Sequence, residues 1–251
     1  MVKVKDIFGF IDSFAPFASQ CEWDNSGLLV GDKEKEVKKI CFCLDITSET
    51  VNTAKAQGAD LIVAHHPVIF KPLSHLCADN PVYLLAKNDI AAICTHTPWD
   101  MAQGGINDIL ADILGFENAQ PLGEIGDENI IRVCEIEPVC IDGLCALVKE
   151  KLGCGVIATD GGREIKRVAV CGGAGGDFLG AVVAAGCDAY ITGEAKYHTY
   201  LSANDCGISL IVAGHFETES VSIPVLAKKI ADRFPEIEAS VITQSAPAKI
   251  Y

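Results

Sequence analysis

Two stretches of this chain decide its fold: Gly58-Ala59-Asp60-Leu61-Ile62-Val63-Ala64-His65-His66 and Gly186-Cys187-Asp188-Ala189-Tyr190-Ile191-Thr192-Gly193-Glu194. Each runs from a glycine through an aspartate into a short apolar segment. The similarity spans residues 27–66 and 155–194, which align without a gap at a constant offset of 128. The identical pairs are Asp32/Asp160, Glu36/Glu164, Lys38/Lys166, Cys43/Cys171, Ala56/Ala184, Gly58/Gly186 and Asp60/Asp188. A repeat that spans a whole half predicts two related lobes.

Further along the chain the offset of the repeat changes to 119. His96 then corresponds to His215, and Asp100 corresponds to Glu219. Each half therefore carries a His-x-x-x-carboxylate motif after an apolar run. The place where two lobes meet is a natural position for a functional site.

Alternating strands and helices predict the fold class α/β, as two related, interlocked lobes with mixed sheets covered by helices. We expect one lobe over residues 1–118, completed by 230–251, and a second over 119–229, with residues 118–129 as the connection. The strands are expected at 27–31, 39–44, 60–64, 91–95, 155–159, 167–171, 188–192, 208–213 and 239–243. The helices are expected at 3–19, 47–57, 81–87, 141–152, 178–185, 196–203 and 219–233. The first two strands of each half are expected to form an antiparallel hairpin.

Composition narrows the range of partners. The chain has 251 residues, 49% of them hydrophobic, and a formal net charge of −14, so a large core is expected and bulk attraction to nucleic acid or an anionic membrane is not. No apolar run approaches a membrane span, and the start of the chain lacks the apolar core of a signal peptide. The 12 cysteines form no C-x-x-C motif. We therefore expect reduced thiols in a cytoplasmic protein.

Histidines follow three of the expected strands: His65-His66, His96 and His215. Ligands gather at the carboxyl ends of strands in open α/β sheets. Adjacent residues of an extended chain point to opposite sides, so His65 and His66 can reach two different metal ions if the chain bends at Pro67. Imidazole and carboxylate together suit zinc, iron, manganese or nickel, and a pair of ions would lie roughly 3.5–4 Å apart.

Two further motifs leave alternatives open. Glu194 and His198 follow the strand that corresponds to the one bearing His65-His66, and they either support a metal site or transfer protons, or they merely belong to a capped helix start. The glycine-rich residues 172–177 either form a phosphate nest or make a tight turn against the sheet.

Five motifs together resemble a known family, the GTP cyclohydrolase 1 type 2 homologues, which are YbgI-like dinuclear metal proteins. The resemblance covers residues 20–230 and matches the short form of the family. The motifs are Trp23-Asp24-Asn25-Ser26-Gly27-Leu28, Ala64-His65-His66-Pro67-Val68-Ile69-Phe70, Thr95-His96-Thr97-Pro98-Trp99-Asp100, Ile191-Thr192-Gly193-Glu194 and Gly214-His215-Phe216-Glu217-Thr218-Glu219.

The resemblance implies two divalent metal ions per subunit at the lobe junction and a toroidal homohexamer. The residues that it implies as metal ligands are His65, His66, Asp100, His215 and Glu219, with Glu219 bridging the two ions. It leaves His96 either as an additional ligand or as a residue that contacts the ligands without binding the metal itself. This chain departs from the family at Pro98-Trp99 and over residues 126–133, where relatives often have a stretch rich in glycine and arginine.

Two functions remain open at this point. One is a metal-dependent hydrolase that opens the ring of a purine nucleotide such as GTP, with Glu194, His198 or His96 handling protons. The other is a non-enzymatic factor that handles or inserts metal, or a scaffold that binds a partner protein. A ring threaded by DNA fits poorly with a net charge of −14.

Overall fold

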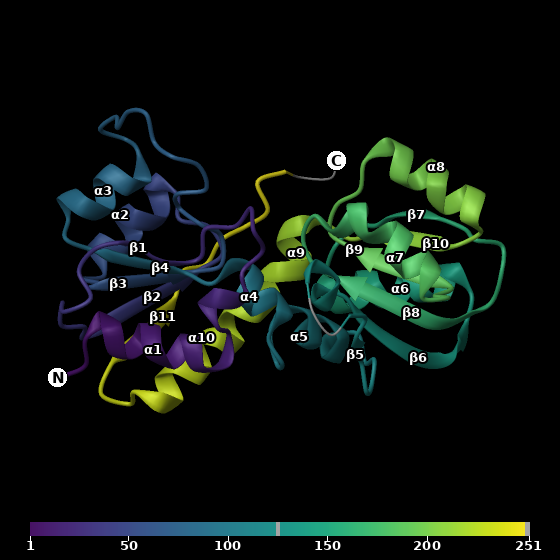
Figure 1. Cartoon of the computed structure of the whole chain (residues 1–251), viewed down its shortest axis with the longest axis horizontal. Helices are drawn as coiled ribbons and strands as arrows, with labels where there is room; N and C mark the ends of the chain where they lie inside the picture. Colours follow the sequence, from purple (N-terminus) through teal and green to yellow (C-terminus); the bar gives the residue numbers. More distant parts are fainter. Residues whose placement is uncertain (124–125, 249–251) are drawn as a thin grey trace. The chain divides into compact units, whose positions relative to one another are not determined.

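The computed structural model describes residues 1–123 and 126–248, with Glu128 described by its backbone alone. These residues pack into two compact units (Figure 1). Unit 1 holds Met1–Gln103 and Ser222–Gln244, and unit 2 holds Gly104–Val221 and the segment that follows Gln244. The segment expected to connect the lobes, 118–129, lies inside unit 2 instead, and its residues 124 and 125 lie outside the described residues. None of the helices in the described ranges is long and apolar enough to cross a membrane.

Unit 1 is built on a five-stranded mixed sheet in the order β1-β4-β3-β2-β11. Its strands are β1 (Gly27–Val30), β2 (Lys39–Cys43), β3 (Leu61–Ala64), β4 (Ala91–Cys94) and β11 (Glu238–Val241). All pairings are parallel except that of β1 with β4. Helices α2 (Ser48–Ala56) and α3 (Pro81–Lys87) cover one face, and α1 (Val4–Phe14) and α10 (Ile223–Arg233) cover the other (Figure 1).

Local chemistry sets where these helices begin and end. Thr47 is the N-cap of α2, where its side chain accepts a hydrogen bond from the Thr50 N–H. Gly58 follows that helix with a φ of +73°, a backbone conformation that favours glycine. The expected helix at 3–19 ends earlier, at Phe14, because Pro16 cannot donate to the helix and restricts the residue before it. Residues 17–19 form a separate 3-10 turn.

Unit 2 is built on a six-stranded mixed sheet in the order β5-β6-β8-β9-β10-β7. Its strands are β5 (Gln120–Pro121), β6 (Arg132–Val139), β7 (Ile157–Thr159), β8 (Ile165–Cys171), β9 (Ala189–Thr192) and β10 (Ser209–Val212). Helices α5 (Ile106–Ile113) and α6 (Ile141–Leu152) bury Leu110 and Leu144 against Val170 and Ile191. Helices α7 (Leu179–Ala184) and α8 (Tyr197–Cys206) belong to the same unit. The sequence reasoning missed α5, β5 and β6.

The internal repeat is confirmed at the level of topology. The strand order β1-β4-β3-β2 of unit 1 matches β7-β10-β9-β8 of unit 2. The register also repeats at the offset of 128, since Ile40 pairs with Leu61 and Val168 pairs with Ala189. One repeated identity has a direct physical reason. Asp60 accepts hydrogen bonds from the Lys38 and Lys39 amides, and Asp188 accepts the same pair from Lys166 and Arg167.

The two expected hairpins are wrong. Strand β1 pairs with β4 rather than β2, and β7 pairs with β10 rather than β8. The reason lies in β2, which is buried along nearly its whole length instead of alternating between core and solvent. Such a strand belongs in the parallel interior of a sheet, where a tight hairpin cannot reach its neighbour.

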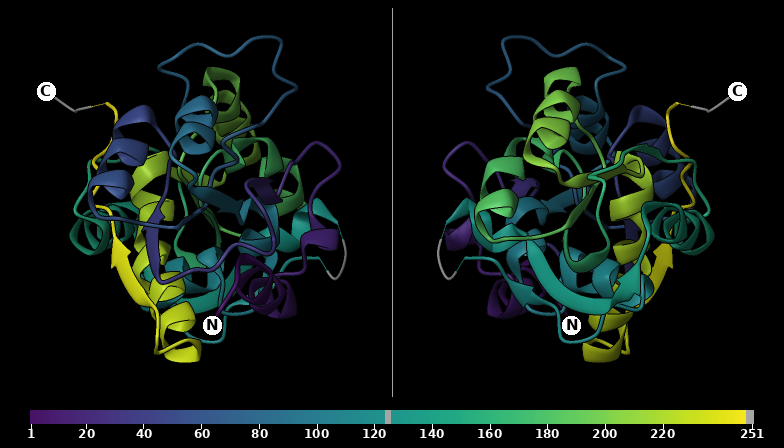
Figure 2. Two further views of the ribbon diagram at one scale, coloured as in Figure 1. Left: turned by 90° about the vertical axis from the view of Figure 1, so that its left-hand side faces the viewer. Right: turned by 90° about the vertical axis from the view of Figure 1, so that its right-hand side faces the viewer.

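The loop between β3 and α3 projects beyond the rest of unit 1 (Figure 2, blue). It carries the exposed His75, which hydrogen-bonds only to its neighbour Ser74 within the described part of the chain. The structure joins none of the twelve cysteines in a disulfide, and all twelve lie within the described residues.

Candidate metal site

His65 and His66 lie directly beyond the carboxyl end of β3. The ladder continues through them, because the amide of His65 donates to Cys43 O and that of His66 donates to Leu44 O. The His65 side chain is fully buried, whereas that of His66 is 22% exposed. Their ring centroids are 4.8 Å apart. The strand end thus presents two imidazoles from adjacent positions.

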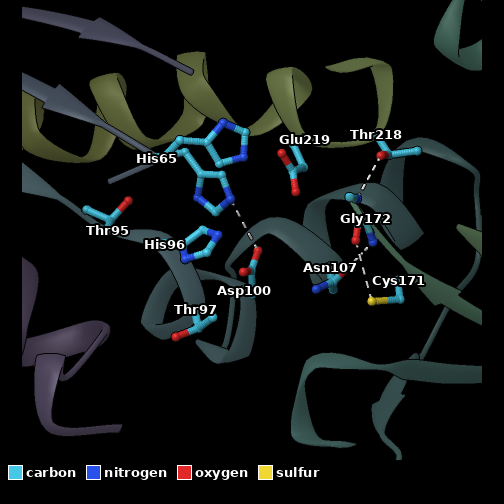
Figure 3. Close-up of polar contacts among 12 residues, drawn as sticks. His65, Thr95, His96, Thr97, Asp100, Asn107, Cys171, Gly172, Thr218 and Glu219 are labelled. Carbon is cyan, nitrogen blue, oxygen red and sulfur yellow. Dashed lines mark hydrogen bonds and ion pairs between the residues drawn. The ribbon is translucent and has the colours of Figure 1, made fainter. Parts of the chain in front are cut away.

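His96 and Asp100 lie on one helix, α4 (His96–Met101), which begins after β4. Pro98 falls in the first turn, where its missing N–H removes no helix hydrogen bond. The spacing of four residues therefore puts His96 and Asp100 on the same face. Asp100 Oδ1 is 3.7 Å from His65 Nε2, and the His96 ring lies beside them (Figure 3).

The donor set of unit 1 fits a divalent metal ion. One ligand atom from each of His65, His66 and His96 lies within 4.8 Å of the other two. Asp100 adds a carboxylate at the His65 side of this group. Imidazole nitrogen with carboxylate oxygen is the donor chemistry of zinc, iron, manganese and nickel sites.

Two aspartates fix the orientation of these histidines. The His66 Nδ1–H donates to Asp45 Oδ1 at 2.7 Å, and the His96 Nδ1–H donates to Asp24 Oδ1 at 2.8 Å. With Nδ1 engaged in this way, Nε2 of each ring is the nitrogen available to a metal. Gln244 secures the Asp45 segment, since its side chain donates to Asp45 O and accepts from the Leu44 amide.

Asp24 is held as a carboxylate by several donors. Its Oδ2 accepts hydrogen bonds from the hydroxyls of Thr97 and Ser26 at 2.5 and 2.8 Å. Burial alone would raise the pKa of Asp24, but the hydrogen bond and charge of His96 and these two hydroxyls hold that pKa well below its usual range. Asp24 therefore joins the loop before β1 to the start of α4.

Unit 2 carries a second histidine and carboxylate pair, on helix α9 (His215–Glu219). His215 Nε2 is 3.1 Å from Glu219 Oε2, because the helical spacing of four puts both side chains on one face. The His215 Nδ1–H donates to Glu194 Oε1 at 3.0 Å. The Glu219 side chain is 6% exposed and that of Glu194 is 60% exposed. Glu194 thus orients His215 as Asp45 orients His66.

The glycine-rich loop after β8 packs against this pair and is not arranged as a phosphate nest. Its amides donate to atoms of the protein: Gly172 to Asn107 Oδ1 (Figure 3), Gly173 to Thr218 Oγ1, Gly175 to Thr192 Oγ1 and Gly176 to Glu194 O. A Cβ on Gly173 would overlap Glu219 Oε1 and approach His215 Nε2 to 3.3 Å. Of the two interpretations of this loop, a phosphate nest or a tight turn, the structure supports the tight turn.

Next to His215, unit 2 contains a cavity of about 320 Å³. It is lined by Cys154, Gly155, Ile157, Gly193, Glu194, Val212, Ala213, Gly214, His215, Phe216, Glu217, Ala246, Pro247 and Ala248. His198 does not line it. That histidine is exposed in the first turn of α8 and makes no hydrogen bond or ion pair within residues 1–123 and 126–248.

Within each unit, the expected site residues thus come together: His65, His66, His96 and Asp100 in unit 1, and Glu194, His215 and Glu219 in unit 2. The sequence reasoning gave no role to Asp24 or Asp45. Both had a usable signal. Asp24 belongs to one of the five recognised motifs, and Asp45 follows the end of β2, where side chains gather at the same edge as those after β3.

Fold and site define a mixed α/β protein with histidine and carboxylate groups suited to metal binding. The chain belongs to the Duf34/NIF3 (NGG1p interacting factor 3) family, whose model matches residues 2–247. A Clostridium perfringens relative called GTP cyclohydrolase 1 type 2 homolog is 33% identical, over 98% of this chain and 97% of its own. A Helicobacter pylori relative called GTP cyclohydrolase 1 type 2 is 32% identical, over 87% and 88%. The resemblance seen in the motifs is thereby confirmed.

Solved structures show the same fold. The protein ybgI, described as of unknown function, superimposes with a TM-score of 0.89 at 27% identity, over 98% of this chain and 100% of its own. HcgD from Methanocaldococcus jannaschii superimposes with a TM-score of 0.85 at 27% identity, over 97% and 98%. Two mixed sheets covered by helices are thus common to this chain and its relatives.

Proposed function

We propose that this protein is a metal-dependent hydrolase that opens the ring of a purine nucleotide. The observation that carries the proposal is the set of three imidazoles in unit 1, two of them oriented by buried or half-buried carboxylates. The names of the relatives support GTP as the substrate. When bound, divalent ions supply Lewis acidity and lower the pKa of water toward about 7.

The proposal assigns two ions to each chain, with His65, His66, Asp100, His215 and Glu219 as ligands. His96 is proposed as a further imidazole ligand, since it shares one group with His65 and His66. The metal is proposed to be zinc, iron, manganese or nickel, because each accepts this donor chemistry.

The remaining polar residues have proposed roles of their own. Asp24 and Asp45 fix the tautomers of His96 and His66, and Glu194 does so for His215. Glu194 is also proposed as a proton carrier, because its carboxylate is exposed and accepts a hydrogen bond from the imidazole of His215. His198 is proposed as a second proton carrier, without a role in orienting a ligand. It is exposed and belongs to the helix that follows Glu194.

The decisive experiment incubates metal-loaded protein with GTP and measures formate. The expected result is catalytic release that is lost in Asp100→Asn and retained in His75→Ala, a matched variant in an exposed loop. Metal content of every variant is measured in parallel. Absence of formate from fully loaded protein contradicts the proposed reaction.

A second candidate is a non-enzymatic protein that handles metal or presents it to a partner. The observation that favours it is the glycine-rich loop, because its amides already donate to atoms of the protein and are not available to bind a phosphate. These amides are those of Gly172, Gly173, Gly175 and Gly176. Transfer of bound metal to an apo-acceptor, without any formate from GTP, is the result that would select this candidate.

A homohexameric ring and a cytoplasmic location also remain part of the proposal. Twelve cysteines without a disulfide among them support a reducing compartment. Light scattering of the purified protein tests the ring, since a mass other than six chains would contradict it.

A further inference from the structure

Two large aromatic side chains are exposed beside the histidines of unit 1. Trp23 is 53% exposed and Phe70 is 46% exposed. Their ring centroids lie 6.0 Å apart, with 47° between the planes. Both rings stand nearly perpendicular to His96, at centroid distances of 5.6 Å for Trp23 and 6.2 Å for Phe70. Burying such surface is favourable, so this pair offers binding energy next to the candidate metal ligands.

The segments that carry these rings are held together. The Asn25 side chain donates to Ile69 O at 2.6 Å, which joins the loop of Trp23 to the loop of Phe70. On either side of Trp23, the Cys21 amide donates to Thr97 Oγ1, and Asp24 is bonded to His96. Aromatic side chains on fixed backbone lose little conformational entropy when a ligand binds.

From this arrangement we infer that Trp23 and Phe70 form a stacking site for the planar base of a purine nucleotide. The inference rests on the proposed function, because it names how that site holds its substrate. Every nucleobase has a π-face, and stacking on exposed aromatic rings adds affinity without base-specific hydrogen bonds. The indole centroid lies 5.6 Å from that of His96, so the proposed stacking surface adjoins a candidate metal ligand.

Tryptophan fluorescence tests the site directly. The chain has two tryptophans, of which Trp99 is fully buried. Titration with guanosine monophosphate, excited beyond the absorbance of the base, is expected to quench emission to saturation. Ribose 5-phosphate, the same ligand without its base, is expected to leave emission unchanged, and the quench is expected to vanish in Trp23→Phe. No saturable quench, or an equal response to ribose 5-phosphate, would overturn the inference.

Equilibrium dialysis of guanosine monophosphate gives a second readout, with no dependence on fluorescence. Trp23→Leu and Phe70→Leu should each weaken binding at least about fivefold, while Trp23→Phe, which keeps an aromatic ring, should bind nearly as well as the parent. Tyr197→Leu is the matched control, because Tyr197 is an aromatic residue of unit 2 with 79% exposure. Metal content and circular dichroism should be unchanged in all four variants.

Two outcomes separate this inference from the proposed reaction. Saturable quenching without formate release from GTP would contradict the reaction and support the stacking site. Formate release with an unaltered KM in Trp23→Leu would support the reaction and overturn the stacking site. A change in the mass of the assembly in the leucine variants, with unchanged nucleotide affinity, would show that the pair covers a second copy of the chain, and would also overturn the inference.

Discussion

At the scale of single residues, the aspartates behind the histidines are as informative as the histidines themselves. An imidazole has two nitrogens, and a metal needs one of them in a fixed direction. In unit 1 the choice is made by Asp45 for His66 and by Asp24 for His96. In unit 2 Glu194 makes it for His215. The sequence predicted the histidines because they end strands, but it gave no sign of which carboxylate reaches which ring.

A substitution at Asp45 tests this role. Asp45→Asn keeps the size of the side chain but weakens the hydrogen bond that orients His66, so the affinity of the protein for zinc or manganese should fall by about 10- to 100-fold. Chelator competition measures the affinity. Asp89→Asn is the control, since the Asp89 side chain is 91% exposed and pairs only with Lys35 among the described residues. Equal affinities in both variants would show that Asp45 does not support a ligand.

The cysteines give a second prediction at this scale. Native protein treated with a thiol reagent at pH 8 should react quickly at Cys77, Cys140 and Cys206, the three exposed thiols. Burial raises the pKa of Cys94 to about 12 and that of Cys134 to about 11, so these thiols stay protonated and slow. All twelve should titrate after denaturation without reductant. A lower total would reveal disulfides or bound metal.

At the scale of elements, the sequence predicted the bounds of helices better than the pairing of strands. The caps and boundaries of α2, α3 and α6 follow from Thr47, Pro81 and the helical spacing of apolar residues. The partners of β1 and β7 could not be read in the same way, because a pattern of burial does not say which strand lies next to which. Helix α5 was missed although Ile106, Ile109 and Leu110 have helical spacing and are buried.

The loop after β8 offers a prediction about how an element supports a site. Gly173→Ala should lower stability by about 1–3 kcal/mol and reduce metal content, because Gly173 has a φ of +63° and its Cβ would overlap the Glu219 carboxylate. Gly180→Ala in α7 is the matched control. No atom lies within 4 Å of its added Cβ, so stability should stay equal or rise by up to about 1 kcal/mol. Urea unfolding and metal analysis measure both effects, and equal behaviour of the two variants would refute the packing argument.

At the scale of the whole molecule, the internal repeat is the main result that sequence alone could provide. The offset of 128 found in the sequence is also the offset of the β2–β3 and β8–β9 registers. Beside the repeated four strands, unit 1 adds β11, which the sequence predicted as a strand at 239–243, whereas unit 2 adds β6 and β5, which the sequence did not reveal. These additions lie outside the repeat, so no internal comparison could identify them.

The repeat leads to a prediction of matched energetics. Asp60→Ala and Asp188→Ala each remove a carboxylate that accepts two backbone hydrogen bonds, so each should destabilise its unit by about 1–3 kcal/mol. Amide hydrogen exchange measures the loss in β2 and β8 separately. A large effect at one aspartate and none at the other would mean that the two equivalent positions do not contribute equally to stability.

The order in which the two units receive their segments matters for synthesis of the chain. A ribosome delivers residues 104–221 as one continuous block, but unit 1 waits for residues 222–244. Until β11 emerges, the nascent chain holds β2 with an open parallel edge and without α10 over one face of its sheet. Open edges of this kind invite pairing with other chains. Translation that stops after residue 221 should therefore leave a second unit that lacks only the segment after Gln244, attached to a first unit that requires chaperones.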